Sequence, residues 1–280
     1  MSFYALALLS VIQGLAELLP VSSSAHVVVA EKLLGLDPSS PPMTFLLVML
    51  HTGTTFAVIL YFWPRWKARL SDARGRREAA RAAAIATAAT GVVGLALKHV
   101  IEHVFLRGAA HQEIETLFSN LPLIAAALAA AGLLTLWAGA RPAGARELDG
   151  RDAALIGAVQ GLCLPFRGFS RSGATISTAL LRGISKSAAE DFSFALAVIL
   201  TPPVVARETL RLLHASTAGG ITWNTGLFAP GLAGMVLSFF AGLAALRWLS
   251  SWLESGRWRW FGWYCLAASG AVLVAASRLH

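Results

Sequence analysis

Charged residues are scarce in this sequence: they make up 14% of its 280 residues, whereas soluble proteins average about 25%. Hydrophobic residues account for 56%, and the mean hydropathy is +0.64. So few charges would leave a water-soluble surface short of polar cover, and lipid is the natural solvent for the excess apolar surface. The apolar residues form long runs rich in alanine, leucine and glycine rather than short alternating segments, which excludes a membrane β-barrel and favours helices.

Cysteine is nearly absent as well: Cys163 and Cys265 lie in apolar segments and form neither a disulfide framework nor a metal-binding spacing. A secretory leader is also missing, since the N-terminus has no basic stretch and no small-residue cleavage site, and we expect it to remain in the mature protein. The net charge of +8 would suit nucleic acid, but the basic residues lie in short loops between apolar runs, where membrane proteins place them. We therefore expect no nucleic-acid partner.

Long apolar runs are plentiful, and six of them reach or approach the roughly 17 to 25 residues that span a bilayer as a helix. They are 45–63, 82–100, 121–139, 192–206, 227–246 and 261–277. Two more apolar segments, 3–34 and 153–184, are interrupted by proline and serine, so that neither arm is long enough to cross alone. Because irregular backbone is tolerated at membrane depth only where protein or a cavity covers it, we predict two re-entrant helix-loop-helix hairpins.

Lysine and arginine are distributed unevenly among the connecting segments. Loop 64–81 is the most basic and should be cytoplasmic, and the segments then expected inside hold more than twice as many basic residues as those outside. The same count of spans places the N- and C-termini outside. The predicted fold is an all-α polytopic membrane protein with about six transmembrane helices and two re-entrant hairpins.

The two interrupted segments resemble each other. Each contains the tripeptide Gln-Gly-Leu, at 13–15 and 160–162, followed by a proline and then by serines. Since the first hairpin would enter from outside and the second from inside, we predict an inverted repeat within a single membrane domain, with halves at about 1–140 and 150–280. Paired broken helices of this kind indicate a site near the membrane midplane. The alternative is a chance similarity between apolar helices.

Polar residues gather at the first interruption. Gln13 and Glu17 are four residues apart and share one helix face, Pro20 should end that helix, and serines and His26 follow. Ionisable residues within membrane segments are costly and are candidates for function. The alternative is that Glu17 and His26 only satisfy each other and the backbone groups freed at the break.

The second interruption contains the run Ser170-Arg171-Ser172-Gly173-Ala174-Thr175. Serine and threonine cap helix starts, and a helix N-terminus suits an anion. Arg171 adds a planar fork that can bind phosphate oxygens, unless it only pairs with Glu17. Together the two interruptions offer a nucleophile, a base and an oxyanion clamp suited to phosphoryl transfer.

The stretch from Gln13 to His26 resembles the (E/Q)xxxE motif and the following serine–histidine segment of the bacterial undecaprenyl-diphosphate phosphatases of the bacitracin-resistance type. Residues 168–175 resemble the PGxSRSxxT motif of that family, and the similarity extends over essentially the whole chain. The resemblance implies hydrolysis of undecaprenyl diphosphate to undecaprenyl phosphate and phosphate, which recycles the lipid carrier for cell-wall polymer synthesis. It also implies a bacterial inner membrane, a site facing the periplasm, and a divalent cation, Mg²⁺ or Ca²⁺.

The resemblance implies roles for particular residues. The residues that match catalytic positions are Glu17, Ser23, His26 and Arg171. Those expected to bind the substrate phosphates are Gln13, Ser22, Ser24, Arg167, Ser170, Ser172, Gly173 and Thr175. Two of these depart from the family: Gln13 stands where many relatives have glutamate, and Arg167 replaces the proline before Gly168. With one motif carboxylate left, Glu17 is the candidate metal ligand, and we expect the cation to be carried mainly on the diphosphate.

The mechanism that these residues suggest begins with attack of Ser23 on the distal phosphorus. Glu17 or His26 would accept the serine proton, and Arg171 would stabilise the developing charge; a histidine nucleophile and direct attack by water are the alternatives. A different function is a polyprenyl-phosphate transporter, or flippase, that uses the same inverted-repeat site. The expected partners are an isoprenoid lipid diphosphate and membrane lipids, and a homodimer is left open.

Overall fold

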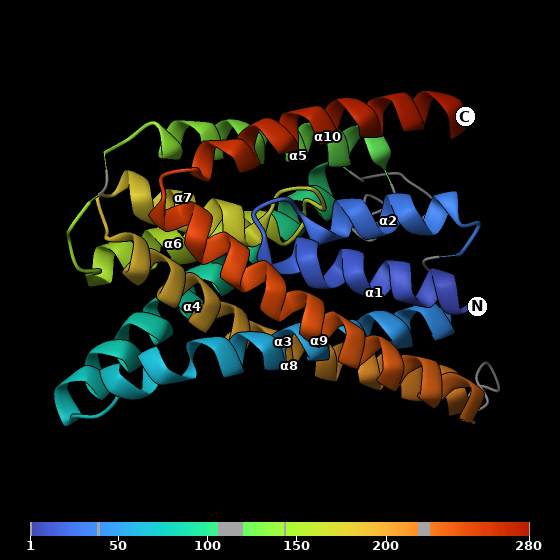
Figure 1. Ribbon diagram of the computed structural model, residues 1–280, viewed down its shortest axis with the longest axis horizontal. Coiled ribbons are helices and arrows are strands. Elements are labelled where there is room, and N and C mark those ends of the chain that lie inside the picture. Colours follow the sequence, from blue (N-terminus) through green and yellow to red (C-terminus); the bar gives the residue numbers. More distant parts are fainter. Residues whose placement is uncertain (1, 38–39, 106–119, 143, 218–224, 280) are drawn as a thin grey trace.

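This computed structural model describes residues 2–37, 40–105, 120–142, 144–217 and 225–279, and Figure 1 shows the helices in chain order. Their bounds are α1 (Phe3–Leu18), α2 (Ser23–Leu33), α3 (Pro41–Arg69), α4 (Ala73–Val100), the short π-helix η1 (Ile101–Phe105), α5 (Leu121–Gly139), α6 (Gly150–Cys163), α7 (Arg171–Leu181), α8 (Lys186–Thr217), α9 (Thr225–Glu254) and α10 (Trp258–Leu279). Within the described residues, β-pairing is limited to one isolated bridge between Arg146 and Ile184.

Six helical stretches are long and apolar enough to cross a membrane. They are Pro41–Arg69, Ala73–His103, Leu121–Gly139, Lys186–Leu210, Phe228–Glu254 and Trp258–Ser277. Much of their apolar surface faces outward; Val92 and Leu95 of α4, for example, are each 70% exposed. Exposed apolar faces of this extent require lipid cover. The prediction of a multi-pass, all-α membrane protein is confirmed.

The fourth predicted span, 192–206, is shorter than the helix that contains it. Helix α8 runs from Lys186 to Thr217 and continues through Pro202 and Pro203. Pro202 lacks the N–H that would bond the carbonyl of Val198, and Val198 lines a partly polar pocket. Membrane helices tolerate such prolines because neighbouring groups can satisfy the freed carbonyl.

The second interrupted segment also begins earlier than the predicted residue 153. Asp149 and Asp152 form a capping box, in which each carboxylate accepts a hydrogen bond from the backbone N–H of the other, and this starts α6 at Gly150. The Asp152 carboxylate is buried and also accepts bonds from Arg182 Nε at 2.8 Å and Arg146 Nη2 at 3.1 Å. This network anchors both ends of the α6–α7 pair.

The two interrupted segments form helix pairs, α1 with α2 and α6 with α7, that occupy opposite halves of the bundle (Figure 1). The arms have 16, 11, 14 and 11 residues, which is short for a membrane-crossing helix. Each pair packs on a span of the other half of the chain, α1 on α9 and α6 on α4. That both pairs are re-entrant in a bilayer stays a prediction, as does the division into inverted repeats.

Glycines of the repeated tripeptide explain how these helices approach. A Cβ at Gly14 would lie 2.5 Å from Ala241 Cβ on α9, and a Cβ at Gly161 would lie 2.8 Å from the Thr90 carbonyl oxygen on α4. Both distances are too short for a side chain, so only glycine permits this packing. The same tripeptide therefore serves the same contact in the two halves.

Gly157, one turn before Gly161, leads to a stability prediction. A Cβ there would lie 2.2 Å from the Ala86 carbonyl oxygen, so we expect Gly157→Ala to force α6 away from α4 and to lower the free energy of unfolding by about 1–3 kcal/mol. Thermal unfolding in detergent would measure the loss. Gly91→Ala is the matched control on α4, because a Cβ there meets no atom within 4 Å. Equal melting temperatures for the two variants would contradict this packing.

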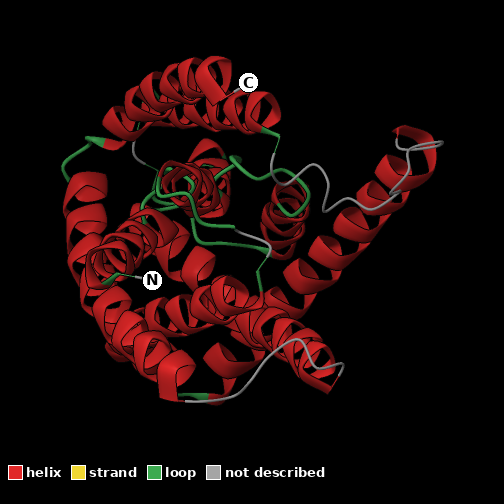
Figure 2. Cartoon of the chain, turned by 90° about the vertical axis from the view of Figure 1, so that its right-hand side faces the viewer, coloured by secondary structure: helices red, strands yellow, loops and turns green. Residues whose placement is uncertain are grey.

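The ends of the chain lie together. Helix α1 begins and α10 ends at one end of the bundle, which faces the viewer in Figure 2, while the α3–α4 and α9–α10 turns lie at the opposite end in Figure 1. Between the ends, a buried apolar core joins the first break to α5, α7, α8 and α10. The core holds the two breaks close to each other near the middle of the bundle.

Candidate functional site

The two interruptions meet at the carboxylate of Glu17, in the last turn of α1. Ser23, the first residue of α2, donates from Oγ to Glu17 Oε2 over 2.6 Å. Arg171, the first residue of α7 and 154 positions away in sequence, donates from Nη2 to Glu17 Oε1 over 2.9 Å. Three of the four predicted catalytic side chains are therefore in direct contact. The Arg171–Glu17 pair is present, whereas Glu17 and His26 do not satisfy each other.

Gln13 and His51 extend this cluster. Gln13 Nε2 donates to Glu17 Oε2 over 3.1 Å and lies 3.1 Å from His51 Nδ1. His51 Nε2 in turn lies 3.7 Å from Glu17 Oε2. His51 both lines a pocket beside this carboxylate and contacts Gln13 of a neighbouring helix. Glu17 is thus surrounded by polar side chains from α1, α2, α3 and α7.

The N-termini of α2 and α7 differ in how they are capped. In α7, Ser170 Oγ accepts a hydrogen bond from the Gly173 N–H over 3.2 Å, so this predicted phosphate-binding amide already has a partner. In α2, the N-cap Ser22 makes no side-chain cap bond, and its hydroxyl lies 3.3 Å from that of Ser24. Free N–H groups at a helix N-terminus suit an anion. The start of α2 is therefore better prepared for a phosphate than the start of α7.

The other predicted phosphate ligands of α7 are buried and bonded within the protein. Ser172 Oγ donates to the Leu19 carbonyl over 3.2 Å, which ties the two breaks together. Thr175 Oγ1 donates to the Arg171 carbonyl over 2.8 Å and lies 2.6 Å from Ser193 Oγ on α8. Both side chains position the loop that carries Arg171. That they also contact phosphate stays a prediction.

Arg167 lies in the loop before α7, next to Gly168. Gly168 has φ +108°, and a Cβ there would lie 2.3 Å from the Ile124 carbonyl oxygen, so the loop can pass α5 only with glycine. Arg167 interacts electrostatically with Glu31 and Glu208. Its contact with a substrate phosphate stays a prediction, which a raised KM in Arg167→Ala would support.

A pocket opens beside the cluster. It is lined by Glu17, Leu18, His51, Thr54, Thr55, Val58, Arg171, Ala197, Val198 and Thr201. The Nη1 atom of Arg171 is buried and has no hydrogen-bond partner among the described residues. Buried donors are almost always satisfied. The Nη2 group of the guanidinium therefore binds Glu17, while the Nη1 group retains a donor for an oxygen atom that the described residues do not supply.

The described residues offer few ligands for a metal ion held by the protein alone. Among the residues that the structure describes, no group of three or more histidine, cysteine or acidic side chains could hold an ion. The Glu17 carboxylate already accepts bonds from Ser23, Gln13 and Arg171. Mg²⁺ usually keeps several waters and is bound through one or two carboxylates together with substrate phosphates. Glu17 as a metal ligand stays a prediction.

His26, the fourth predicted catalytic residue, faces a different group. Its Nδ1 lies 2.7 Å from the Ser22 carbonyl oxygen, and its Nε2 lies 2.7 Å from the hydroxyl of Tyr264 on α10. Sequence reasoning missed Tyr264, because it is one aromatic residue among several in the last span. Only the folded chain brings it to the first break.

Comparisons with known proteins agree with the two motifs. The family described as "Bacitracin resistance protein BacA" matches residues 6–271. "Undecaprenyl-diphosphatase 2" of Acinetobacter baylyi is 59% identical over 274 residues, covering 96% of each chain. "Undecaprenyl-diphosphatase" of Acidiphilium cryptum is 37% identical and covers 82% of this chain and 83% of its own, and that of Desulfatibacillum aliphaticivorans is 33% identical and covers 96% of each. The chain therefore belongs to the bacitracin resistance protein BacA family.

Proposed function

We propose that this chain is a phosphatase that hydrolyses undecaprenyl diphosphate to undecaprenyl phosphate and inorganic phosphate. The observation that carries the proposal is the arrangement at Glu17, which binds the Ser23 hydroxyl on one oxygen and the Arg171 guanidinium on the other. The unpartnered Nη1 of Arg171 supplies a place for a phosphate oxygen. Relatives that match nearly the full length are named for this activity.

The reaction proceeds in two displacements. Ser23 Oγ attacks the distal phosphorus, its proton passes to Glu17 Oε2, and the bond from that phosphorus to the bridging oxygen breaks, so that undecaprenyl phosphate leaves. Glu17 passes that proton to the departing undecaprenyl phosphate and becomes a carboxylate again. Water then attacks the phosphoserine and gives a proton to Glu17, which returns it to the serine oxygen as the bond from that oxygen to phosphorus breaks and phosphate leaves. Arg171 and the N-terminus of α2 stabilise the charge that develops on the transferred phosphoryl group.

Glu17, rather than His26, is the proton acceptor in this proposal. The Ser23 hydroxyl already points at the Glu17 carboxylate over 2.6 Å, which is the geometry that a general base requires. Both ring nitrogens of His26 are occupied by other partners. Of the two acceptors that the sequence left open, distance therefore favours Glu17.

The divalent cation enters on the substrate. We expect Mg²⁺ or Ca²⁺ to bind the diphosphate itself, because the site offers a single carboxylate that is already engaged. Release of inorganic phosphate from C55 diphosphate by the purified protein should therefore stop with a chelator and return with Mg²⁺. The melting temperature of the substrate-free protein should not respond to Mg²⁺. A marked rise in that temperature would contradict delivery by the substrate.

The same assay decides between enzyme and carrier. Well-folded protein that releases no phosphate with any divalent ion would refute the phosphatase. Lipid reorientation in liposomes without phosphate release would then favour the polyprenyl-phosphate transporter, a function that the names of the relatives do not favour. The partners that the phosphatase requires are the isoprenoid lipid diphosphate and the surrounding membrane lipids; a homodimer stays an open prediction.

The distribution of basic residues supports a proposed orientation of the chain. We place the chain in the bacterial inner membrane with its termini outside and its site facing the periplasm. The support is that basic residues concentrate in 64–81, whose turn lies at the end of the bundle opposite the termini (Figure 1).

A further inference from the structure

The residue before the proposed nucleophile has an unfavourable backbone conformation. Ser22 has φ 67° and ψ 97°, and it is the one residue other than glycine with positive φ in the described part of the chain. Such a conformation costs about 1–3 kcal/mol and persists only where the surroundings hold it. Because Ser22 directly precedes Ser23, this conformation sets the direction in which α2 starts and the Ser23 hydroxyl points.

His26 holds Ser22 in place through a defined arrangement of protons. Its Nδ1 lies 2.7 Å from the Ser22 carbonyl oxygen, which can only accept, so Nδ1 must carry a hydrogen. The Nε2 of a neutral ring is then an acceptor, and the Tyr264 hydroxyl, 2.7 Å away, donates to it. The two rings are also stacked, with centroids 5.6 Å apart and planes 12° from parallel. The Ser22 carbonyl thus sets the tautomer of the histidine, and the tyrosine fixes the orientation of its ring.

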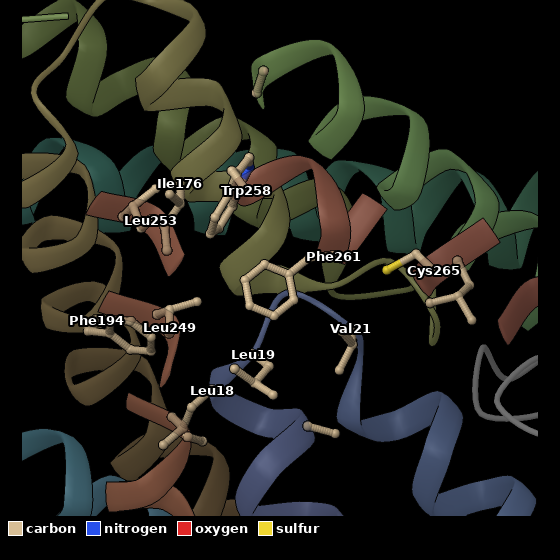
Figure 3. Packing of buried hydrophobic residues seen from close by; sticks show 14 of the residues in the cluster. Leu18, Leu19, Val21, Ile176, Phe194, Leu249, Leu253, Trp258, Phe261 and Cys265 are labelled. Atoms are coloured by element: carbon tan, nitrogen blue, oxygen red, sulfur yellow. The ribbon is translucent and has the colours of Figure 1, made fainter. Parts of the chain in front are cut away.

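The rest of α10 covers the same break. Cys265, the neighbour of Tyr264, donates from Sγ to the Pro20 carbonyl over 3.2 Å. Figure 3 shows Phe261 and Cys265 facing the buried side chains of Leu19 and Val21. Helix α10 therefore contacts the break at successive positions. Among these contacts, the hydrogen bond of Tyr264 reaches Ser22 through His26.

We propose that Tyr264 is a positioning residue: through His26 it fixes the Ser22 carbonyl, and so directs the Ser23 hydroxyl at Glu17. This inference rests on the proposed phosphatase. Within it, His26 neither attacks the substrate nor removes the serine proton; it transmits the constraint from α10 to the backbone of the break. Tyr264 itself is half-exposed, and its side-chain hydrogen bond within the described part of the chain goes to His26 rather than to a residue of the Glu17 cluster.

The first test removes one hydroxyl. Tyr264→Phe should lower kcat for phosphate release about ten- to a hundredfold, because small misplacements of a reacting group carry costs of this size, while KM and the melting temperature stay unchanged. Tyr61→Phe is the matched control, since it removes a hydroxyl that donates to Ser250 Oγ over 3.0 Å, among residues outside the site. A Tyr264→Phe enzyme with wild-type kcat would overturn the inference. Absence of release in wild type would instead refute the phosphatase.

The second test separates positioning from proton transfer. The amide nitrogen of an asparagine can occupy the place of Nδ1, and that of a glutamine the place of Nε2. His26→Asn keeps the bond to Ser22 but loses the one to Tyr264, so it should lose about as much kcat as Tyr264→Phe, while His26→Gln should lose about a hundredfold or more. Adding Tyr264→Phe to His26→Asn should cause no further loss, because the two residues act as one unit. Equal inactivity of the asparagine and glutamine variants, or losses that multiply, would overturn the inference.

Discussion

Arg171→Ala should abolish phosphate release, with kcat/KM reduced at least about a thousandfold. Removal of one preorganised donor to a transition-state oxygen costs about a hundred- to a thousandfold, and this variant also leaves Glu17 without its cationic partner. The carboxylate is 17% exposed, so its unpaired charge would be poorly solvated. Inorganic phosphate release from C55 diphosphate by detergent-purified protein measures the effect.

Two further arginine variants test whether the geometry of the Arg171 guanidinium, rather than its charge alone, is required. Arg171→Lys keeps the positive charge but loses the fork that binds Glu17 through Nη2 and leaves Nη1 for the substrate; we expect it to remain strongly impaired. Arg151→Ala, an exposed residue in the first turn of α6, should behave as wild type. Full activity in the lysine variant would show that positive charge alone suffices. It would contradict the use of Nη2 for Glu17 and Nη1 for the substrate.

Ser23→Ala should reduce kcat by at least about a thousandfold, because it removes the nucleophile while leaving the charged groups in place. Its hydroxyl makes the 2.6 Å bond to Glu17 and is the group best placed to attack. Rapid quenching of wild type during turnover should trap a phosphate on Ser23, detectable as a mass increase of the peptide that contains it. Turnover without any covalent species would favour direct attack by water.

Ser24→Ala is the matched control for this experiment. Ser24 is the next residue of the same helical turn, and its hydroxyl lies 3.3 Å from that of Ser22 rather than near Glu17. We expect a loss of about tenfold or less, because one hydrogen bond within the break is removed and the nucleophile is kept. Equal losses for Ser23→Ala and Ser24→Ala would contradict the assignment of Ser23 as the attacking group.

The sequence predicted the spans well because long apolar runs report directly on the bilayer. The run 121–139 coincides with α5, and the other runs lie within longer helices. Errors arose where local chemistry overrides hydropathy. Helix α8 passes two prolines that a hydropathy reading treats as a boundary, and α6 begins at a capping box built from charged residues.

The candidate site was predicted in composition but not in geometry. The motifs brought Glu17, Ser23 and Arg171 together as a set, and these three are in contact. The sequence could not tell whether Glu17 or His26 faces the serine, because both lie within a few residues of the break. That question depends on the direction of a single strained residue, Ser22, which carries no sequence signal.

By itself, the sequence determined that this protein lies in a membrane, that it is all-helical, which family it belongs to, and which residue types stand at the two breaks. It could do so because hydropathy and motif spacing are local properties of the chain. Only the tertiary structure decided which of those residues touch. Arg171 reaches Glu17 across 154 positions, and Tyr264 reaches His26 across 238. Contacts of that length depend on how the helices pack, and glycines such as Gly14 and Gly161 set that packing through distances that only the folded bundle defines.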